Sequence, residues 1–319
     1  MELSVMKPIL VIGIGGSGSK IATSIYKKLD SECLLISTHE EDLKNVVKSI
    51  KITTDQIINP SINTIKSYTY KTKDKIKKII DKYNTIVIIA NLSGNNGNGI
   101  APILSQICHG AKKNIVSLVI MPFGFEKNRL FISNVSLKHL RRNSDCMMIF
   151  DNNALLDSNP NLTASECHEI SSDTMNKIIH LLKSPELSRD TNLVTTSKNM
   201  NSFELMLTDS LKMLYKNVKP ENVTQTIVHV LLSKNSKLLD VNYISNVIEN
   251  IYNCNNVVTA SYSKSTNMPK IILVAAIKNN HYMNFNKYDP LESIPTSNKI
   301  DCNDMEYNTN CKLPLYQLE

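Results

Sequence analysis

Two glycine-rich turns constrain this chain more than any other feature of its sequence. GIGGSG at residues 13–18 follows the apolar run PILVI, and SGNNGNG at residues 93–99 follows TIVIIA. Each turn leads into a segment whose apolar residues have helical spacing. Because free backbone N–H groups and the positive end of the helix dipole meet at a helix start, two starts facing one crevice favour bound phosphate. The predicted phosphate-binding residues are Gly13, Gly15, Gly16, Ser17, Gly18, Ser93, Gly94, Asn95, Asn96, Gly97, Asn98 and Gly99.

Composition places few other limits on the chain. Its 319 residues are 42% hydrophobic, which suffices for a sizeable core. The N-terminal MELSVMKP contains no long apolar run, so we expect neither a signal peptide nor direct membrane insertion. The seven cysteines form no CxxC pair, a pattern typical of reduced thiols in a cytoplasmic protein, and we expect no protein-built metal site.

Charge is distributed unevenly along the chain. Residues 1–150 hold 21 Lys and Arg against 11 Asp and Glu, a net charge of +10, which leaves −3 for residues 151–319. A basic first half suits a polyanionic ligand or contact with an acidic neighbour. The run from Lys66 to Lys82, with three interleaved tyrosines, has lysines 71, 75, 78 and 82 on one helix face. We favour a solvated helix face and expect no nucleic-acid partner, because charge runs alone are weak indicators of recognition.

Short β-branched runs alternate with helical patterns through the first half of the chain. Strands are predicted at residues 8–14, 33–37, 85–90, 115–121 and 146–150, and helices at 18–29, 39–49, 72–82, 99–112 and 129–143. This alternation predicts an α/β, Rossmann-like parallel sheet. Such a sheet binds its ligand at the carboxyl ends of the strands, where both glycine turns fall.

The second half has a different order of elements. A long central helix is predicted at residues 164–183, closed by Pro185. A strand at 203–207, helices at 208–216 and 239–252, and strands at 225–232, 257–262 and 270–277 predict a smaller α+β domain. After Lys278 the chain is rich in Asn, Asp, Ser and Tyr, which is typical of a flexible tail.

The first turn by itself also matches the dinucleotide-binding pattern GxGxxG. Gly13, Gly15 and Gly18 supply its glycines, and Glu40, Glu41 and Asp42 lie near the position of the acid that holds a ribose hydroxyl. A dinucleotide-dependent enzyme therefore stays open as an interpretation of this turn. It does not explain the second turn, and two phosphate loops fit a triphosphate better.

The order of motifs resembles the tubulin and FtsZ superfamily of polymerising GTPases over residues 7–278. SGNNGNG is similar to the family's GGGTGTG loop. The most specific blocks are PFGFEKNR at 122–129 and LRRNSDCMMIFDNNALL at 140–156, which are similar to the family's PFxFEG…R loop and LxxxxDxxxxxPNDxLL segment. The resemblance implies a GTP-binding domain at 1–163, a central helix at 164–183, an α+β domain with an intersubunit loop at 184–278, and a tail at 279–319.

The same resemblance assigns nucleotide contacts. Glu126 and Arg129 would border the ribose and phosphates of GTP or GDP, and Asn152 would contact the nucleoside. Glu169 on the central helix would accept from the two donors of guanine, although a surface Glu on an amphipathic helix explains that position equally well. Ala164 stands where the family stacks an aromatic ring on the base. Mg²⁺ is expected to accompany GTP.

The hydrolytic segment departs from the family pattern. In the family, a loop reading NxDxxD enters the next subunit's nucleotide pocket, and SPELSRDTNLVTT occupies its place here. By resemblance Asp190 matches the first acid, acting in trans, while Leu193 replaces the second; a capping role explains Asp190 equally well. Loss of a group that activates water typically costs on the order of 10² to 10⁴ in rate, so we expect slow or absent hydrolysis. The loop QIINPSIN also lacks the glycines of the family's γ-phosphate sensor, so close approach of its backbone to phosphate is not expected.

The resemblance therefore implies a cytoplasmic, FtsZ-like protein that forms head-to-tail homopolymers under the control of GTP. Two alternatives stay open: an active cell-division GTPase of the FtsZ type and a dinucleotide-dependent enzyme. The terminal KLPLYQLE at residues 312–319 is a further expected binding segment, for a partner protein.

Overall fold

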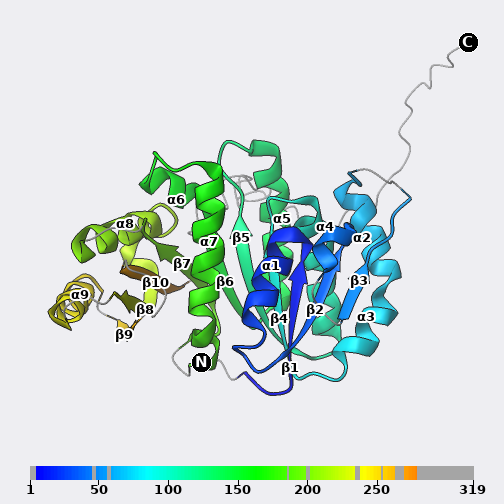
Figure 1. Cartoon of the computed structure of the whole chain (residues 1–319), viewed down its shortest axis with the longest axis horizontal. Coiled ribbons are helices and arrows are strands. Elements are labelled where there is room, and N and C mark those ends of the chain that lie inside the picture. The colour runs from blue at the N-terminus through cyan, green and yellow to red at the C-terminus, as the bar shows by residue number, and fades with distance from the viewer. Residues whose placement is uncertain are drawn as a thin grey trace, which may run out of the picture.

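One ten-stranded sheet forms the centre of the molecule (Figure 1). The computed structural model describes residues 5–44, 48–55, 59–184, 187–198, 202–233, 238–252, 254–262 and 269–278. The strand order is β3-β2-β1-β4-β5-β6-β7-β10-β8-β9. The strands are β1 Ile9–Ile14, β2 Glu32–Ser37, β3 Lys48–Lys51, β4 Thr85–Asn91, β5 Asn114–Met121, β6 Cys146–Asp151, β7 Thr191–Thr196, β8 Val223–Leu232, β9 Asn255–Tyr262 and β10 Lys270–Ile277.

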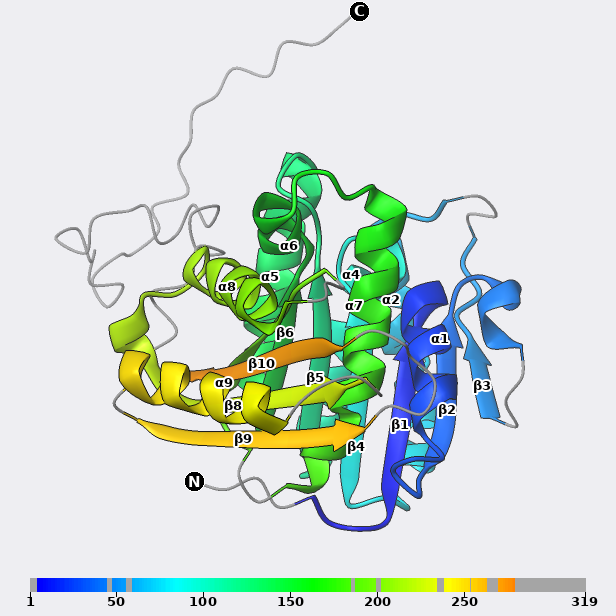
Figure 2. The same ribbon diagram turned by 60° about the vertical axis from the view of Figure 1, so that its left-hand side comes forward.

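The sheet is mostly parallel, as the sequence predicts. Neighbouring strands from β3 to β7 run parallel, whereas β10 runs antiparallel to both β7 and β8. Strands buried on both faces read as continuous apolar runs, and every residue of β1 and β5 is buried. Figure 2 shows the twist of the sheet, with β8, β9 and β10 crossing the direction of β1 and β2.

Helices cover both faces of the sheet. The helices are α1 Gly15–Ile25, α2 Ile62–Lys71, α3 Lys73–Ile80, α4 Asn95–Gly110, α5 Lys127–Asn143, α6 Asn152–Ser158, α7 Ala164–Ile178, α8 Phe203–Tyr215 and α9 Leu238–Ile251. Apolar residues of α1, α6 and α7 share one core cluster, and those of α2 to α5 share the other with α8 and α9. In Figure 1, α1 and α7 accordingly lie in front of the strands. Among the described residues, no helix is long and apolar enough to cross a membrane.

One helix predicted in the first half is wrong, and another helix was missed. Of the described residues in the segment 39–49, Glu40–Leu43 forms a 3₁₀ turn, and the chain from Lys48 pairs with β2 as the edge strand β3. The helix predicted at 72–82 is present as α3, but it is preceded by α2, which the Asn- and Thr-rich composition concealed. Ser61 caps α2 by accepting from Thr64 N–H at 3.1 Å.

The strand predicted at residues 203–207 is wrong, since this segment begins helix α8. Ser202 caps that helix by accepting a hydrogen bond from Leu205 N–H. The strand lies earlier, in β7, which pairs with β6 on one side and β10 on the other. The short run FELML, with four apolar residues and one Glu, is compatible with either a strand or a helix. Packing of α8 against the sheet decides in favour of the helix.

The central helix is confirmed as two consecutive segments. α7 starts with a capping box between Thr163 and Glu166 and runs to Ile178, and Ile179–Lys183 continues it as a 3₁₀ helix. Since β7 pairs with β6, the sheet is continuous across the boundary predicted between the two domains. The division at 163 and 184 stays a prediction, and the tail at 279–319 lies outside the described residues.

Candidate nucleotide-binding site

Two helices begin at the carboxyl edge of neighbouring strands. α1 starts at Gly15, directly after β1, and α4 starts at Asn95, soon after β4, which pairs with β1 so that Ile14 lies opposite Ala90. Neither Ile14 nor Gly94 provides a side-chain cap, and neither first turn contains an acidic residue. The free N–H groups of both helices are therefore available at one edge of the sheet.

Close approach between the two loops explains why some of their glycines are needed. Gly15 has a φ of +64°, in the left-handed region, and a Cβ placed there would lie 3.0 Å from Cβ of Asn96. A Cβ on Gly97 would lie 2.0 Å from the carbonyl oxygen of Asn91, which is too close for any side chain. A side chain at Gly15 would push the two helix starts apart, and one at Gly97 would push α4 away from the end of β4.

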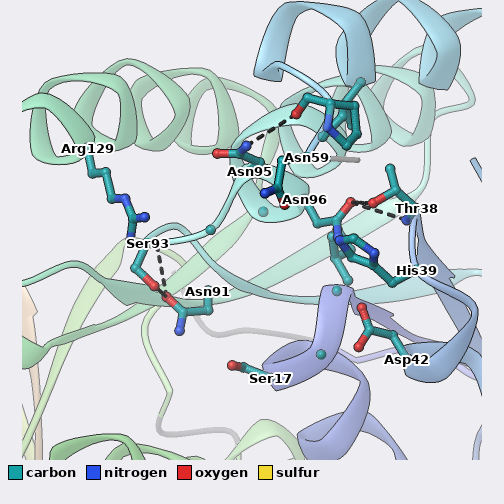
Figure 3. Close-up of a pocket in the computed structure, with 17 residues that line it drawn as sticks. Ser17, Thr38, His39, Asp42, Asn59, Asn91, Ser93, Asn95, Asn96 and Arg129 are labelled. Atoms are coloured by element: carbon teal, nitrogen blue, oxygen red, sulfur yellow. Dashed lines mark hydrogen bonds between the residues drawn. The ribbon is translucent and has the colours of Figure 1, made fainter. Parts of the chain in front are cut away.

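The two loops enclose a cavity of about 600 Å³ (Figure 3). A cavity of this size falls in the range of small-molecule and cofactor sites. Its wall is formed by Ile14, Gly15, Gly16, Ser17, Thr38, His39, Asp42, Asn59, Pro60, Ile65, Asn91, Ser93, Gly94, Asn95, Asn96, Gly97 and Arg129.

Asn96 connects the second glycine loop to the end of β2. Its Oδ1 accepts from the backbone N–H of Thr38 at 3.2 Å and from Thr38 Oγ1 at 2.9 Å, while its Nδ2 donates to Ser37 Oγ at 3.2 Å. The Ser37 hydroxyl in turn donates to Asp42 Oδ2 at 2.6 Å. This chain of bonds fixes both the loop and the Asp42 carboxylate at the cavity.

A third loop completes the wall without glycine. Pro60 accepts a hydrogen bond from Asn95 Nδ2 at 3.2 Å through its carbonyl oxygen, which brings the segment against the second glycine loop. Asn59 has a φ of +47°, a conformation that asparagine tolerates better than most residues with a Cβ. The loop therefore reaches the cavity although its sequence lacks the glycines that close approach was expected to require.

One guanidinium faces the cavity from the start of α5. Arg129 lines the wall, and its Nη1 donates to Glu126 Oε1 at 2.7 Å. Glu126 is itself held by the backbone N–H of Phe123 at 3.3 Å and its side chain is only 18% exposed. Figure 3 shows Arg129 above Ser93, on the opposite side from His39 and Asp42. An anion in the cavity would thus meet a positive side chain whose position is set by a carboxylate.

Four of the predicted loop residues lie behind the cavity instead of lining it. A Cβ on Gly13, Gly18 or Gly99 would lie 2.5 to 2.7 Å from neighbouring atoms. Gly13 and Gly18 therefore let strand and helix pack closely, and Gly99 lets α4 pack closely against α2. Asn98 is buried and donates to the carbonyls of Leu92 and Gly94, the latter at 3.2 Å. These residues support the loops, and their contact with a nucleotide stays a prediction.

The residues predicted to contact the nucleoside also lie outside the cavity wall. Asn152 is fully buried at the start of α6, and neither polar atom of its amide has a partner among the described residues. Glu169 is exposed on α7, one residue after His168, whose ring meets Phe123 edge-on at 5.4 Å. Phe123 follows β5, so Glu169 lies near the carboxyl edge of the sheet. Both roles stay predictions.

Asp190 lies at the opposite edge of the sheet. Its carbonyl accepts from the backbone N–H of Met147, at the start of β6, at 3.2 Å, and Thr191 is paired with Met147. The amino end of β6 is a full strand length from the carboxyl edge, so Asp190 cannot reach the cavity of its own chain. Its exposed side chain accepts a hydrogen bond from Ser188 Oγ at 3.2 Å, and strand β7 follows it, so the role in trans and the capping role both stay predictions.

Leu193, the position assigned to the missing second acid, lies inside β7. Its side chain is 2% exposed, and its backbone pairs with Ile149 on one side and Ala275 on the other. The loop thus ends at Asp190, and the residues that follow are strand.

Several wall residues were missed by sequence reasoning. Thr38, His39 and Asn91 were not selected, because they lie outside both glycine turns. The signal available was position, since each follows or ends a parallel strand beside a glycine turn. Asp42 was considered only as a ribose-binding acid.

Comparison with known proteins agrees with this geometry. Residues 8–160 match the model of the tubulin/FtsZ family GTPase domain. The chain is a divergent member of the tubulin/FtsZ family. It is 25% identical over 250 residues to a protein named cell division protein FtsZ 2 from Haloferax volcanii, covering 74% of this chain and 60% of that relative. This tubulin/FtsZ-family chain therefore spans about 60% of the length of the curated relative that it matches.

Solved structures of the tubulin/FtsZ family share the fold. An FtsZ dimer from M. jannaschii superposes with a TM-score of 0.66 at 18% identity, over 84% of this chain and 87% of that one. TubZ of Clostridium botulinum phage c-st gives a TM-score of 0.61 at 17% identity, over 86% and 93% of the two chains. The α/β fold with its mostly parallel sheet is thereby confirmed.

Proposed function

We propose that this chain binds GTP in the 600 Å³ cavity and that bound nucleotide controls its assembly into head-to-tail filaments. The observation that carries the proposal is the pair of uncapped helix starts, α1 and α4, opening on one cavity. Family membership adds support, because one structural neighbour, CetZ2 from Haloferax volcanii, is described as a protofilament with bound GTPγS. Its TM-score is 0.60.

Each part of the cavity has a role in this proposal. The N–H groups at the starts of α1 and α4 bind phosphate oxygens, and Arg129 neutralises part of their charge. Glu126 orients Arg129 and borders the ribose. Asn152 contacts the nucleoside and so gains partners for its buried amide, and Glu169 accepts from the guanine edge.

Magnesium would enter with the nucleotide. The described residues contain no group of three or more His, Cys, Asp or Glu side chains that could hold a metal ion. Mg²⁺ in nucleotide sites is held mostly by phosphates and water, with one or two carboxylates, and Asp42 is a carboxylate of the cavity wall. When bound, the ion supplies positive charge against the phosphates.

Hydrolysis is proposed to be weak. Asp190 would act on the nucleotide of the next subunit, since it lies at the edge of the sheet opposite its own cavity. A second acid is lacking at Leu193, which is buried in β7. One acid without its partner activates water less well, by roughly 10² to 10⁴ in rate.

The proposal is tested by measuring three quantities on the same samples: binding of a fluorescent GTP analogue, magnesium-dependent phosphate release, and light scattering across a protein concentration series. We expect saturable GTP binding, scattering that requires GTP, and little phosphate release. Arg129→Ala should weaken GTP binding at least tenfold. Strong phosphate release that rises with scattering would indicate an active FtsZ-type GTPase instead. Binding of NAD without binding of GTP would indicate a dinucleotide enzyme and would refute the proposal.

Two finer parts of the proposal concern segments or processes beyond the cavity. We propose that residues 312–319, which lie outside the described residues, bind a partner protein. Removing them should abolish capture of that partner while leaving GTP binding unchanged. Relatives named as cell division proteins suggest that process for this chain, and depletion followed by microscopy of septa would test it.

A further inference from the structure

The helices α2, α3, α4 and α5 form a strongly basic face on one side of the sheet. Residues 62–82, 95–113 and 127–143, which comprise these helices and their ends, hold 14 Lys and Arg against two Asp; one of the 14, Arg129, faces the cavity and is paired with Glu126. Their net charge of +12 exceeds the +7 of the whole chain, so all other residues together carry −5. The lysine run of α2 and α3 alone gave no reason to expect a nucleic-acid partner, whereas the fold adds the charges at the ends of α4 and α5 to the same face.

Contacts between the helices show that these charges act on one surface. Lys113, after α4, donates through Nζ to the carbonyl of Asp81, after α3, at 3.0 Å. On α5 the pKa of His139 is lowered by partial burial and then by the positive charges of Lys66 on α2 and Arg142. Apolar residues of all four helices share a core cluster beneath this surface.

The lysines of α2 and α3 are not neutralised by carboxylates. Among the described residues, none of the seven lysines between residues 62 and 82 makes an ion pair. Lys71 lies over the ring of Tyr68 at 4.2 Å, and Lys73 lies over Tyr70 at 4.7 Å. Unpaired like charges repel one another and weaken the fold slightly, so a surface that gathers them is suited to a polyanion.

We propose that this basic face binds the phosphate backbone of a double-stranded nucleic acid without sequence preference. Lysine is a compact point charge that neutralises phosphates without reading bases, and counterion release supplies the binding free energy. A bilayer fits less well, because stable attachment of a basic surface needs a second, apolar anchor. Among the described residues of these four helices, the exposed large apolar side chains are those of Tyr70 on α2 and Phe131 on α5, which together form no extended apolar anchor. Filament assembly would present many copies of the basic face to one duplex and so raise the avidity for nucleic acid. Binding of the duplex by a single chain does not depend on the GTP cavity.

The test compares two variants of equal net charge in the full chain. The first is Lys71→Gln, Lys75→Gln, Lys78→Gln and Lys82→Gln combined, which removes four exposed lysines of the face. The control is Lys27→Gln, Lys198→Gln, Lys216→Gln and Lys219→Gln combined, which removes four exposed lysines from other surfaces. Circular dichroism and thermal melting verify that both variants fold. Binding to a labelled DNA duplex of about 30 base pairs is measured by anisotropy, without GTP, between about 50 and 200 mM salt.

We expect the unmodified protein to bind with a Kd near or below about 10⁻⁴ M at the lowest salt, weakening steeply as salt rises. The face variant should bind at least about tenfold more weakly and lower the slope of log K against log salt by roughly 2 to 4. The control should bind within about twofold of the unmodified protein. Equal losses in both variants, or no saturable binding, would overturn the proposal.

Two further measurements distinguish the duplex from two other occupants of the basic face, an anionic membrane and a second copy of this chain. Sedimentation with vesicles containing phosphatidylserine would overturn the proposal if vesicles bind more tightly than the duplex and the face variant loses that binding. Light scattering without DNA would overturn it if the face variant fails to assemble while neither protein binds duplex, because the occupant would then be a second copy of this chain. Duplex binding by an unmodified protein that does not bind GTP would leave this proposal intact and refute only the proposed function.

Discussion

The parallel and antiparallel parts of the sheet are built from similar apolar strands but serve different purposes. From β3 to β7 the carboxyl ends meet at one edge, and there α1 and α4 begin beside the cavity. The antiparallel part consists of β10, β8 and β9: β10 runs antiparallel to both β7 and β8, while β8 and β9 run in the same direction as β7. The glycine loops that follow β1 and β4, and not strand composition or direction alone, therefore decide which part of the molecule can bind a nucleotide.

The antiparallel part is attached to the central helix by an ion pair between a buried lysine and a partly exposed aspartate. Lys270, at the start of β10, donates to Asp173 of α7 at 2.7 Å, and its side chain is 4% exposed. The negative charge of Asp173 opposes the loss of hydration that lowers the pKa of this lysine. This contact fixes the antiparallel part against α7, whose other end lies near the nucleotide edge.

The largest expected effect concerns the junction between the two parts. Leu193→Asp would place a carboxylate between β6 and β10, where the leucine is 2% exposed, and should reduce the free energy of unfolding by about 4 kcal/mol or more. Urea unfolding would measure this loss. Leu193→Met, which conserves volume, should cost less than about 1.5 kcal/mol. A folded Leu193→Asp protein that hydrolyses GTP faster would mean that this residue lies in an accessible loop.

Lowering the pH should change the stability contributed by a group in each of the two parts in opposite directions. Burial lowers the pKa of His229, on β8, from 6.5 to about 4, so its contribution to stability is complete above pH 6.5 and is lost as pH falls toward 4. Burial raises the pKa of Asp151, at the end of β6, from 3.8 to about 6, so its contribution is complete below pH 3.8 and is lost as pH rises through 6. Each change amounts to about 3 kcal/mol.

Unfolding free energies between pH 4 and 7 would separate these contributions. His229→Gln should make the protein more stable as pH falls through this window, since Asp151 then acts alone. In Asp151→Asn, the free energy of unfolding should fall more steeply as pH is lowered, because the loss due to His229 is no longer offset by Asp151. Identical pH slopes in both variants and the unmodified protein would show that neither group responds to its burial.

A smaller effect is expected within the glycine loops. Gly97→Ala would bring Cβ to 2.0 Å from the Asn91 carbonyl oxygen, so the loop must shift, with a loss of about 1 to 3 kcal/mol. GTP binding should weaken by about tenfold or more, since the N–H groups of α4 move. Gly94→Ala is the matched control, because the nearest atom to its Cβ would be 4.0 Å away. Thermal melting and titration with a fluorescent GTP analogue would measure both effects. Equal effects in the two variants would mean that close approach does not explain Gly97.

The smallest effect on stability is expected at Asp190. Asp190→Asn should change the free energy of unfolding by less than about 0.5 kcal/mol, because the side chain is exposed. GTP binding to the monomer should not change, since this residue lies at the opposite edge of the sheet. Any phosphate release that depends on protein concentration should fall, while Glu221→Gln, at another exposed acid, should leave it unchanged. A loss of GTP binding by dilute Asp190→Asn protein would contradict the proposed role in trans.

Local patterns predicted most of the parallel part and less of the rest. The five strands predicted in residues 8–150 are all present, because buried parallel strands give unbroken apolar runs. The strand β3 and the helix start at Phe203 were missed, since their short or ambiguous sequences are decided by the neighbours they pack against. Gly15, Gly16, Ser17, Ser93, Gly94, Asn95, Asn96, Gly97 and Arg129 line the cavity as the sequence suggested.

The sequence by itself determined the glycine turns, the strands that precede them and the family resemblance, because these depend on residue type at close spacing. Only the tertiary structure decided that Thr38, His39 and Asn59 join the cavity and that Leu193 is buried. The same holds for the basic face, whose charges come from four helices. Contacts between distant segments depend on strand order and register, and no local pattern specifies these.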